Sequence, residues 1–277
     1  MRIFLTGGTG FLGAHFLQQA LLRGHEVTAL RRLGSSPRIP IAGSVEWIDS
    51  ELHQVPIELL RGCDAFVHLA AQGVSPQKTD WTTAFEVNVA HSIALVERAL
   101  RAGISRILCC GSCMEYGSEA EKFEQIPASA PLNPSGPYAS SKAAFTLALT
   151  ALAIETKAII SLLRPFHFYG EGQHQANLWP SLRSAALSGQ DFAMTAGEQM
   201  RDFSSVEDVA QAFLDELQRS DHESGRIHIA NVGSGIAISL ADFSKSWWSN
   251  WNASGKLLLG VLPYREHEVM RFIPKLS

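Results

Sequence analysis

Two kinds of hydrophobic pattern alternate along the first 165 residues of the chain. Short apolar runs predict buried strands, and longer segments with apolar residues at helical spacing predict helices. The predicted strands are Arg2–Thr6, Glu26–Leu30, Val45–Ile48, Asp64–Leu69, Arg106–Cys110 and Ile159–Leu163. One predicted helix ends at Leu22, and two others span Ala84–Ala102 and Ser140–Thr156. Strands and helices in this order predict an α/β fold with a doubly wound parallel sheet.

The pattern becomes less regular beyond Tyr169, where glycine, proline and polar clusters separate helical segments such as Val206–Gln218 and Leu240–Trp251. We therefore expect residues 1–168 to form the sheet domain and residues 169–277 to form mainly a smaller C-terminal domain. A segment around residues 204–232 is expected to return to the sheet domain.

Composition narrows the classes of protein. The chain has 277 residues, of which 46% are hydrophobic and 18% charged, with a net charge of −4. Without a run of lysine or arginine, we expect no nucleic-acid partner and no anionic membrane partner. The apolar stretch Ile3–Leu5 is too short for a signal peptide, and Ala143–Ile154 is too short to span a bilayer. We expect a cytoplasmic protein.

The four cysteines are Cys63, Cys109, Cys110 and Cys113. Neighbouring residues on a strand point to opposite faces, so Cys109 and Cys110 are poorly placed to share a metal or to pair. No second CxxC and no histidine pair at ligand spacing accompanies them. We expect buried thiols in a reducing compartment and no metal site.

Gly7, Gly10 and Gly13 form a G-x-x-G-x-x-G motif between the first predicted strand and the first helix. Glycines at this point allow a tight turn and let a pyrophosphate approach the N–H groups of the helix N-terminus. The motif in this setting predicts a Rossmann-type sheet that binds a dinucleotide.

The end of the second strand bears on which dinucleotide binds. An acidic residue there binds the ribose 2′-hydroxyl of NAD, whereas arginine accommodates the 2′-phosphate of NADP. This strand leads into Arg31 and Arg32, with no carboxylate beside them in the sequence. We therefore favour NADP(H) over NAD(H), with a solvated surface charge as the alternative role for Arg32.

Residues 138–142 read YASSK, which places Tyr138 and Lys142 on one face of a helix. A nearby ammonium stabilises a phenolate, so Lys142 is expected to lower the pKa of Tyr138 and make it a usable general acid or base. Ser112 follows the fifth predicted strand, at the sheet edge where ligands bind. Its hydroxyl could bond a substrate carbonyl and the phenol together, which predicts a catalytic set of Ser112, Tyr138 and Lys142.

Several separated motifs in the right order resemble the extended short-chain dehydrogenase/reductases, in particular the nucleotide-sugar branch with its NAD-dependent epimerases and dehydratases. The similar segments cover most of the chain: TGGTGFLG at 6–13, DAFVHLAA at 64–71, CCGSCMEYG at 109–117, GPYASSK at 136–142, LRPFHFYGEG at 163–172, RDFSSVEDVAQAF at 201–213 and PYREHEVMR at 263–271. The resemblance implies a Rossmann-type domain with a smaller C-terminal substrate-binding domain.

The resemblance also implies roles for single residues. Asp49 would bond the adenine amine, Ala70 and Ala71 would line the dinucleotide, and Lys142 would hold the nicotinamide ribose. Asn177, Arg201 and Arg265 would bind the diphosphate of a nucleotide sugar, since a guanidinium meets two phosphate oxygens at once. Each arginine has a surface ion pair as its alternative role. Further implied cofactor contacts are Phe11, Leu12, Ser50, Leu69, Asn88 and Pro165.

The departures from the family pattern narrow the reaction. The similar 4,6-dehydratases carry an Asp-Glu pair directly after the catalytic Ser or Thr, but here Cys113 and Met114 stand there, which argues against dehydration. The arginines after the second strand favour a reductase over an epimerase that keeps NAD bound. The prediction is an NADP(H)-dependent reductase of a nucleotide-activated 4-keto-6-deoxy sugar.

Three alternatives remain open. The first is an NAD-dependent nucleotide-sugar 4-epimerase, and the second is a reductase of carbonyl compounds that are not nucleotides. The third is a dinucleotide-binding regulator without catalysis, although such relatives typically lose the Tyr or Lys that is present here. The resemblance further suggests a possible homodimer.

Overall fold

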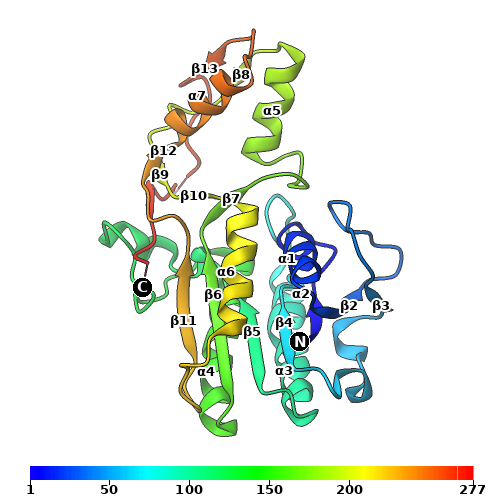
Figure 1. Cartoon of the computed structure of the whole chain (residues 1–277). Helices are drawn as coiled ribbons and strands as arrows, with labels where there is room; N and C mark the ends of the chain where they lie inside the picture. Colours follow the sequence, from blue (N-terminus) through cyan, green and yellow to red (C-terminus); the bar gives the residue numbers. More distant parts are fainter. Residues whose placement is uncertain (267, 277) are drawn as a thin grey trace.

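A seven-stranded parallel sheet forms the larger part of the molecule in the computed structural model, which describes residues 1–266 and 268–276 (Figure 1). Its strand order is β11-β6-β5-β4-β1-β2-β3, and every neighbouring pair is parallel. The strands are β1 Arg2–Thr6, β2 Glu26–Arg31, β3 Glu46–Asp49, β4 Ala65–His68, β5 Arg106–Cys110, β6 Ile159–Pro165 and β11 His228–Val232. The order reverses at β1, so the predicted doubly wound fold is confirmed.

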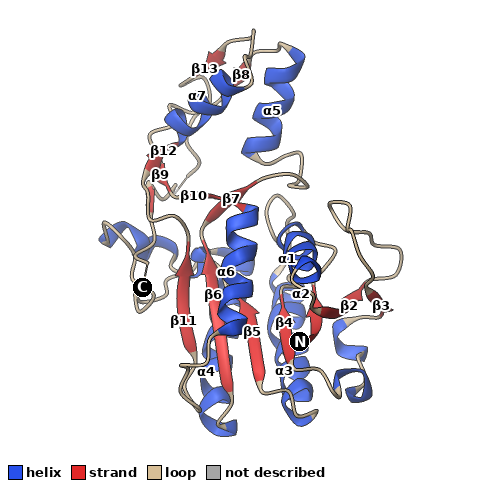
Figure 2. Ribbon diagram, viewed as in Figure 1, coloured by secondary structure: helices blue, strands red, loops and turns tan. Residues whose placement is uncertain are grey.

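Helices cover both faces of this sheet (Figure 2). On one face α1 packs against α6, and their apolar residues share a core with β1 and β4 that includes Phe16 and Phe213. The other face is covered by α3 and α4, whose Leu95 and Phe145 lie in a second core. The helices are α1 Phe11–Leu22, α2 Trp81–Phe85, α3 Ser92–Arg101, α4 Gly136–Thr156 and α6 Val206–Gln218. Because helices cover both faces of the sheet, the central strands β1, β4, β5 and β6 are mostly buried and mainly apolar, whereas the edge strand β3 has no buried residue.

The predicted single helix Ala84–Ala102 is instead three segments. Between α2 and α3 the backbone makes a π-helical turn, η3, over Glu86–His91. Such a turn widens the helix by one residue and often marks a functional position. Short 3₁₀ segments complete the connections: η1 Leu52–Gln54, η2 Ile57–Leu60, η4 Cys113–Glu115 and η5 Gly117–Lys122.

Beyond β6 the chain builds a smaller unit above the carboxyl edge of the sheet (Figures 1 and 2). It contains α5 Leu178–Ser188, α7 Leu240–Asn250 and three small sheets. Their strands are β7 His167–Tyr169, β8 Phe192–Ala193, β9 Met200–Arg201, β10 Phe203–Ser205, β12 Ile238–Ser239, β13 Leu257–Leu258 and β14 Arg271–Phe272. Aromatic rings hold α5 against α7, since Trp179 meets Trp247 and Trp251 edge to face at 5.5 and 5.6 Å between ring centroids.

Two later segments contribute to the large sheet domain. Strand β11 pairs with β6 along its whole length, and α6 packs on α1. Both lie within the segment 204–232 that was expected to return to the sheet domain, while the proposed division at residues 168 and 169 stays a prediction.

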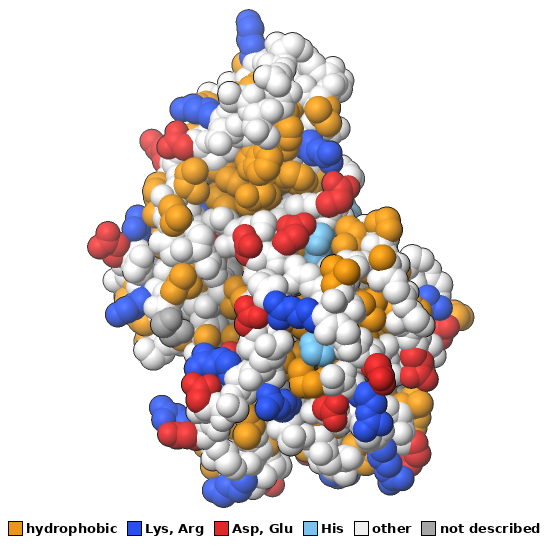
Figure 3. Space-filling model, viewed as in Figure 1, with side chains coloured by type: hydrophobic (Ala, Val, Ile, Leu, Met, Phe, Trp, Pro, Cys, Tyr) orange, Lys and Arg blue, Asp and Glu red, His pale blue; other side chains and the backbone are white. Residues whose placement is uncertain are grey.

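The surface carries acidic and basic side chains interspersed on the face seen in Figure 3, with hydrophobic side chains gathered below α5 and α7. None of the helices in the described part of the chain is both long and apolar enough to cross a membrane.

Candidate active site

The glycine motif adopts the close turn that its sequence predicts. Gly7 has φ +77°, and a Cβ atom there would lie 2.6 Å from the backbone of Leu69 and Ala70 at the end of β4. A Cβ on Gly13 would lie 2.0 Å from the Gly7 carbonyl oxygen. Only glycine allows β1, α1 and β4 to approach so closely, which leaves the N-terminal N–H groups of α1 open to a phosphate. The cradle therefore fits a dinucleotide pyrophosphate.

The predicted cofactor residues around this cradle lie at the carboxyl ends of the strands. Phe11 and Leu12 form the first turn of α1, where the Phe11 ring stacks on Phe168 at 5.4 Å between centroids. Ala70 donates its N–H to the Thr6 hydroxyl at 3.3 Å. Leu69, Ala71 and Pro165 complete this edge, with Leu69 and Ala71 directly after β4 and Pro165 as the last residue of β6.

A buried histidine supports this edge and was missed by sequence reasoning. His68, at the end of β4, is hydrogen-bonded through Nδ1 to the Thr6 hydroxyl at 2.8 Å and through Nε2 to the Ser92 hydroxyl at 2.9 Å. Burial, together with the Lys142 ammonium, lowers the pKa of His68 to about 3. The ring is therefore neutral and links β1, β4 and α3 beneath the predicted dinucleotide position.

Ser112 directly follows Gly111 at the end of β5 and caps the 3₁₀ segment η4. Its hydroxyl accepts from the Met114 N–H at 3.2 Å, and its own N–H donates to Glu115 Oε1 at 2.8 Å. The Glu115 carboxylate is fully buried and also accepts from Thr146 at 2.8 Å and from Arg164 at 2.9 Å. This reciprocal capping box fixes the backbone at Ser112, and Glu115 is a second residue that sequence reasoning missed.

Tyr138 and Lys142 lie one turn apart near the start of α4, which begins at Gly136 and therefore one turn earlier than the predicted Ser140. Pro137 in the first turn fixes a φ suited to a helix start. The Ser112 side chain lies close enough to Tyr138 to act on the pKa of its phenol. The structure therefore brings the predicted catalytic residues Ser112 and Tyr138 together.

The pKa of Tyr138 differs from the expectation. Burial raises it above the ordinary value, the nearby Cys110 sulfur acts in the same direction, and the nearby Ser112 side chain lowers it. Tyr138 itself is half-buried, whereas Lys142 is buried and its ammonium donates to the Cys110 carbonyl oxygen. The expectation that Lys142 would lower the phenol pKa is thus wrong for this structure, because desolvation dominates. The phenol remains protonated at neutral pH.

Asn88 lies in the π-helical turn η3, and its side chain makes three hydrogen bonds within the protein. Its amide donates to the Gln72 carbonyl at 3.0 Å and to the Ser141 hydroxyl at 2.9 Å, and its oxygen accepts from the Gln72 N–H at 2.7 Å. Ser141 in turn donates to the Tyr138 carbonyl at 2.8 Å. Asn88 therefore connects the loop after β4 to the start of α4. Through Ser141 this connection reaches the backbone of Tyr138.

The end of β2 carries a cation that the structure pairs with a carboxylate. Arg31 donates through Nε to Asp49 at 2.8 Å, and its guanidinium lies 5.1 Å above the Trp47 ring. The register of β2 and β3 places Arg31 opposite Asp49, which no motif indicated. Ser50 donates its N–H to the Arg31 carbonyl at 3.0 Å, and Arg32 is exposed. A carboxylate thus stands beside the arginine after all, on the neighbouring strand.

The predicted diphosphate ligands are distributed over the smaller unit. Arg201 is buried and donates to Glu268 at 3.0 Å and to the Val269 carbonyl at 2.7 Å. Arg265 is exposed in the same late segment, three residues before Glu268, so the RDF and R-x-x-E segments do come together. Asn177 stands apart as the N-cap residue of α5.

A half-buried histidine, His167 in β7, lies beside Arg201 and was also missed. Burial and the Arg201 charge lower its pKa to about 3. Its Nδ1 is shielded from solvent and has no hydrogen-bond partner within the described residues. A neutral imidazole with an unused polar atom is suited to contact a bound ligand.

All four cysteines are free. Cys109 and Cys113 are buried, as expected for small apolar side chains, and burial raises the pKa of Cys113 to about 12. The Cys113 thiol is therefore neutral and does not serve as an acid or base near pH 7.

Comparison with known proteins identifies the family. The model of the NAD dependent epimerase/dehydratase family matches residues 3–233. The chain therefore belongs to this family and is an enzyme of the extended short-chain dehydrogenase/reductase type. The resemblance inferred from the motifs is confirmed.

Relatives of known activity fall into several reaction classes. The chain is 27% identical to the UDP-glucose 4-epimerase of Neisseria meningitidis serogroup B, over 89% of this chain and 81% of that protein. It is 24% identical to the dTDP-6-deoxy-L-talose 4-dehydrogenase (NAD(+)) of Aggregatibacter actinomycetemcomitans, over 98% of both chains. The solved structure of MoeE5 in complex with UDP-glucuronic acid and NAD is 25% identical, with a TM-score of 0.85 over 100% of this chain and 90% of that one.

Proposed function

We propose that this enzyme reduces the C4 ketone of a nucleotide-activated 4-keto-6-deoxy sugar with NADPH. The hydroxyls of Ser112 and Tyr138 bond the ketone oxygen, and Tyr138 donates the proton that turns this oxygen into a hydroxyl. The nicotinamide, when bound, supplies the hydride to C4. Lys142 holds the nicotinamide ribose and restores a proton to Tyr138.

The observation that carries this proposal is that Ser112 lies beside a protonated Tyr138, with Lys142 one helical turn further along α4. Ketone reduction needs a proton donor, whereas oxidation of a sugar hydroxyl, the first step of epimerisation, needs a base. Since burial raises the phenol pKa, the apoenzyme holds Tyr138 in the form that reduction requires.

Residues next to Ser112 support reduction over dehydration. Cys113 is a neutral thiol and Met114 is a thioether, so neither position offers the acid or base that would remove water from the sugar. The relative named a 4-dehydrogenase of a deoxysugar nucleotide supports redox chemistry at the 4 position as a net reaction.

The proposed preference for NADPH rests on Arg31 and Arg32. Arg31 bonds Asp49 through Nε, and no described residue bonds its terminal nitrogens, which are the donors that a 2′-phosphate would use. Arg32 is exposed beside it and adds positive charge. If Asp49 instead bonds the ribose hydroxyls at the carboxyl ends of β2 and β3, NADH is the cosubstrate.

The second candidate function is a nucleotide-sugar 4-epimerase, which the similarity to UDP-glucose 4-epimerases favours. The two functions differ in net redox balance. A reductase consumes one reduced nicotinamide for each sugar, and an epimerase consumes none.

The test is to follow the absorbance of NADPH and NADH separately with UDP-, dTDP-, GDP- and CDP-4-keto-6-deoxyhexoses. Turnover with one of them, faster with NADPH, is the expected result. Conversion of UDP-glucose to UDP-galactose without net oxidation of cofactor would establish the epimerase instead. Tyr138→Phe separates both enzymes from a regulator, because a regulator would keep its ligand response.

A further inference from the structure

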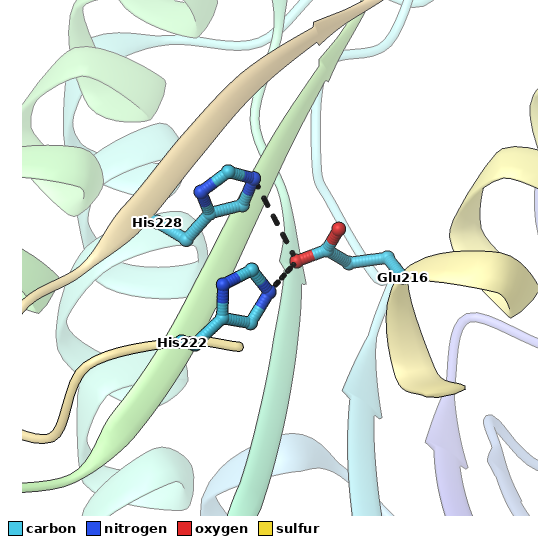
Figure 4. A group of neighbouring side chains, drawn as sticks. All are labelled: Glu216, His222 and His228. Atoms are coloured by element: carbon cyan, nitrogen blue, oxygen red, sulfur yellow. Dashed lines mark hydrogen bonds and ion pairs between the residues drawn. The ribbon is translucent and has the colours of Figure 1, made fainter. Parts of the chain in front are cut away.

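A cluster of two histidines and a glutamate lies outside the predicted active site. Glu216 belongs to the last turn of α6, His222 to the following loop, and His228 is the first residue of β11. The two imidazole rings stack with centroids 4.3 Å apart, and both turn toward one carboxylate oxygen, as Figure 4 shows. His222 Nε2 lies 2.6 Å and His228 Nε2 lies 3.9 Å from Glu216 Oε1. The three potential ligand atoms all lie within 4.8 Å of one another.

The cluster and Ser112 occupy opposite edges of the sheet. His228 opens β11 and is paired with Ser161 near the start of β6, so it lies toward the amino edge. Ser112 comes after the last residue of β5 and lies at the carboxyl edge. Because the strands are parallel, the cluster takes no part in the proposed reduction.

The cluster is largely enclosed. The side chains of Glu216, His222 and His228 are 6%, 8% and 24% exposed. His228 Nε2 is shielded from solvent and has no hydrogen-bond partner among the described residues. A shielded imidazole nitrogen that points at a carboxylate without bonding it is an unused ligand atom.

The nearest cation, Arg219, approaches one oxygen of the Glu216 carboxylate, and the two histidines approach the other. Arg219 forms two hydrogen bonds with Asp221, at 3.0 and 2.8 Å, and approaches Glu216 only through Oε2 at 3.9 Å. Oε1 therefore faces the two imidazoles alone. Asp221 neutralises the nearest cation, which reduces its repulsion of a bound metal ion.

We propose that Glu216, His222 and His228 bind a zinc ion. Two imidazoles and a carboxylate are a ligand set typical of zinc, with water as the fourth ligand. Bonds of 2.0–2.1 Å in a tetrahedral site place ligand atoms about 3.3 Å apart. The observed 2.6 and 3.9 Å separations bracket this value, so small side-chain movements suffice. Nitrogen ligands disfavour magnesium and calcium.

The ion acts as a structural clip. It ties the end of α6 and the loop over residues 219–227 to the edge strand β11, and a ligand of the folded state alone raises stability. The three residues are spaced six apart and come from three elements, so no local metal motif reveals them in the sequence.

The test uses tag-free protein dialysed against a chelator and then loaded with zinc. We expect equilibrium dialysis to give one zinc per chain, and Co²⁺ to give the intense visible absorption of a four-coordinate site. Zinc is expected to raise Tm. Replacing His228 is informative because its Nε2 makes no bond that folding requires. His228→Gln keeps the Glu216–His222 contact and is expected to weaken zinc binding by at least about tenfold.

His53→Gln is the matched control. His53 is exposed and its ring meets that of His91 at 4.6 Å, so the variant removes one histidine of another pair and is expected to bind zinc as the parent does. Glu216→Gln retains an oxygen toward His222 and is expected to lose zinc while remaining folded by circular dichroism. Failure of the parent to retain one zinc, or equal zinc affinity in His228→Gln and His53→Gln, would overturn the proposal.

Discussion

Arg164 and Glu115 form an ion pair that is almost completely buried, with Arg164 Nε donating to Glu115 Oε2 at 2.9 Å and side-chain exposures of 2% and 0%. Arg164 also donates to the Tyr116 hydroxyl at 2.9 Å and lies over its ring. The other Glu115 oxygen accepts from the Ser112 N–H. One buried pair therefore connects the end of β6 to the predicted catalytic serine.

Removing Arg164 is expected to destabilise the fold strongly. Arg164→Met leaves the Glu115 carboxylate buried without its cation, and breaking a buried pair in this way costs about 3–5 kcal/mol. Urea unfolding measures the change in the free energy of unfolding. Arg183→Met is the control, since the Arg183–Glu171 pair is 43% and 69% exposed and its loss is expected to cost below about 1 kcal/mol. Equal losses in the two variants would contradict a structural role for the buried pair.

Tyr138→Phe is expected to reduce kcat for ketone reduction by a factor of about 10²–10⁴, the usual range for losing a positioned general acid. Dinucleotide binding, measured by quenching of tryptophan fluorescence, is expected to remain close to that of the parent. Ser112→Ala removes the second donor to the ketone and is expected to lower kcat more than it raises KM. A Tyr138→Phe enzyme that reduces the ketone at the parental rate would exclude Tyr138 as the proton donor.

The parts of the fold that sequence predicted well depend on local signals. Helix α6 has the predicted bounds Val206–Gln218, because Ser205 caps it through the Asp208 N–H and its apolar residues repeat at helical spacing. The glycine motif was informative for a similar reason, since at Gly7 and Gly13 any Cβ would collide with backbone.

The parts that sequence missed depend on tertiary pairing. Glu115 and Arg164 lie 49 residues apart, and their contact follows from the meeting of β6 with the segment after β5. Arg31 and Asp49 meet only because of the β2–β3 register. Propensity and motif spacing carry no information on either contact. The expected lowering of the Tyr138 pKa was wrong for the same reason. The sequence shows the neighbouring charge of Lys142, but it does not show that the phenol is shielded from solvent.

The pH profile tests the raised pKa of Tyr138. Reduction needs the protonated phenol, so activity is lost as pH rises through the phenol pKa. A pKa raised above the ordinary value of about 10 keeps the donor protonated, and kcat is expected to stay level from neutral pH to about 10. Since the Ser112 side chain lowers this pKa, Ser112→Ala is expected to move the alkaline loss of activity to still higher pH. A decline of kcat centred near neutral pH would instead show that a lowered pKa governs the reaction.

The paired charges at the end of β2 offer a test of cofactor choice. Arg31→Ala removes a charge-assisted contact to the 2′-phosphate and is expected to lower kcat/KM for NADPH by about tenfold, with a smaller effect for NADH. Asp49→Asn removes the negative charge beside Arg31 and is expected to raise the NADPH to NADH ratio of kcat/KM. Both ratios are measured by initial rates with the same sugar.

Arg23→Ala provides the control for these ratios, because Arg23 pairs with Asp215 at 3.2 Å at the C-terminal end of α1 and lies away from β2's carboxyl end. Its ratio is expected to equal that of the parent. An unchanged ratio in Arg31→Ala would exclude Arg31 as a ligand of the 2′-phosphate and leave Arg32 as the one arginine of this pair to account for a preference for NADPH. If Asp49→Asn loses turnover with NADH while turnover with NADPH stays low, the result would show that Asp49 binds the ribose hydroxyls of NAD.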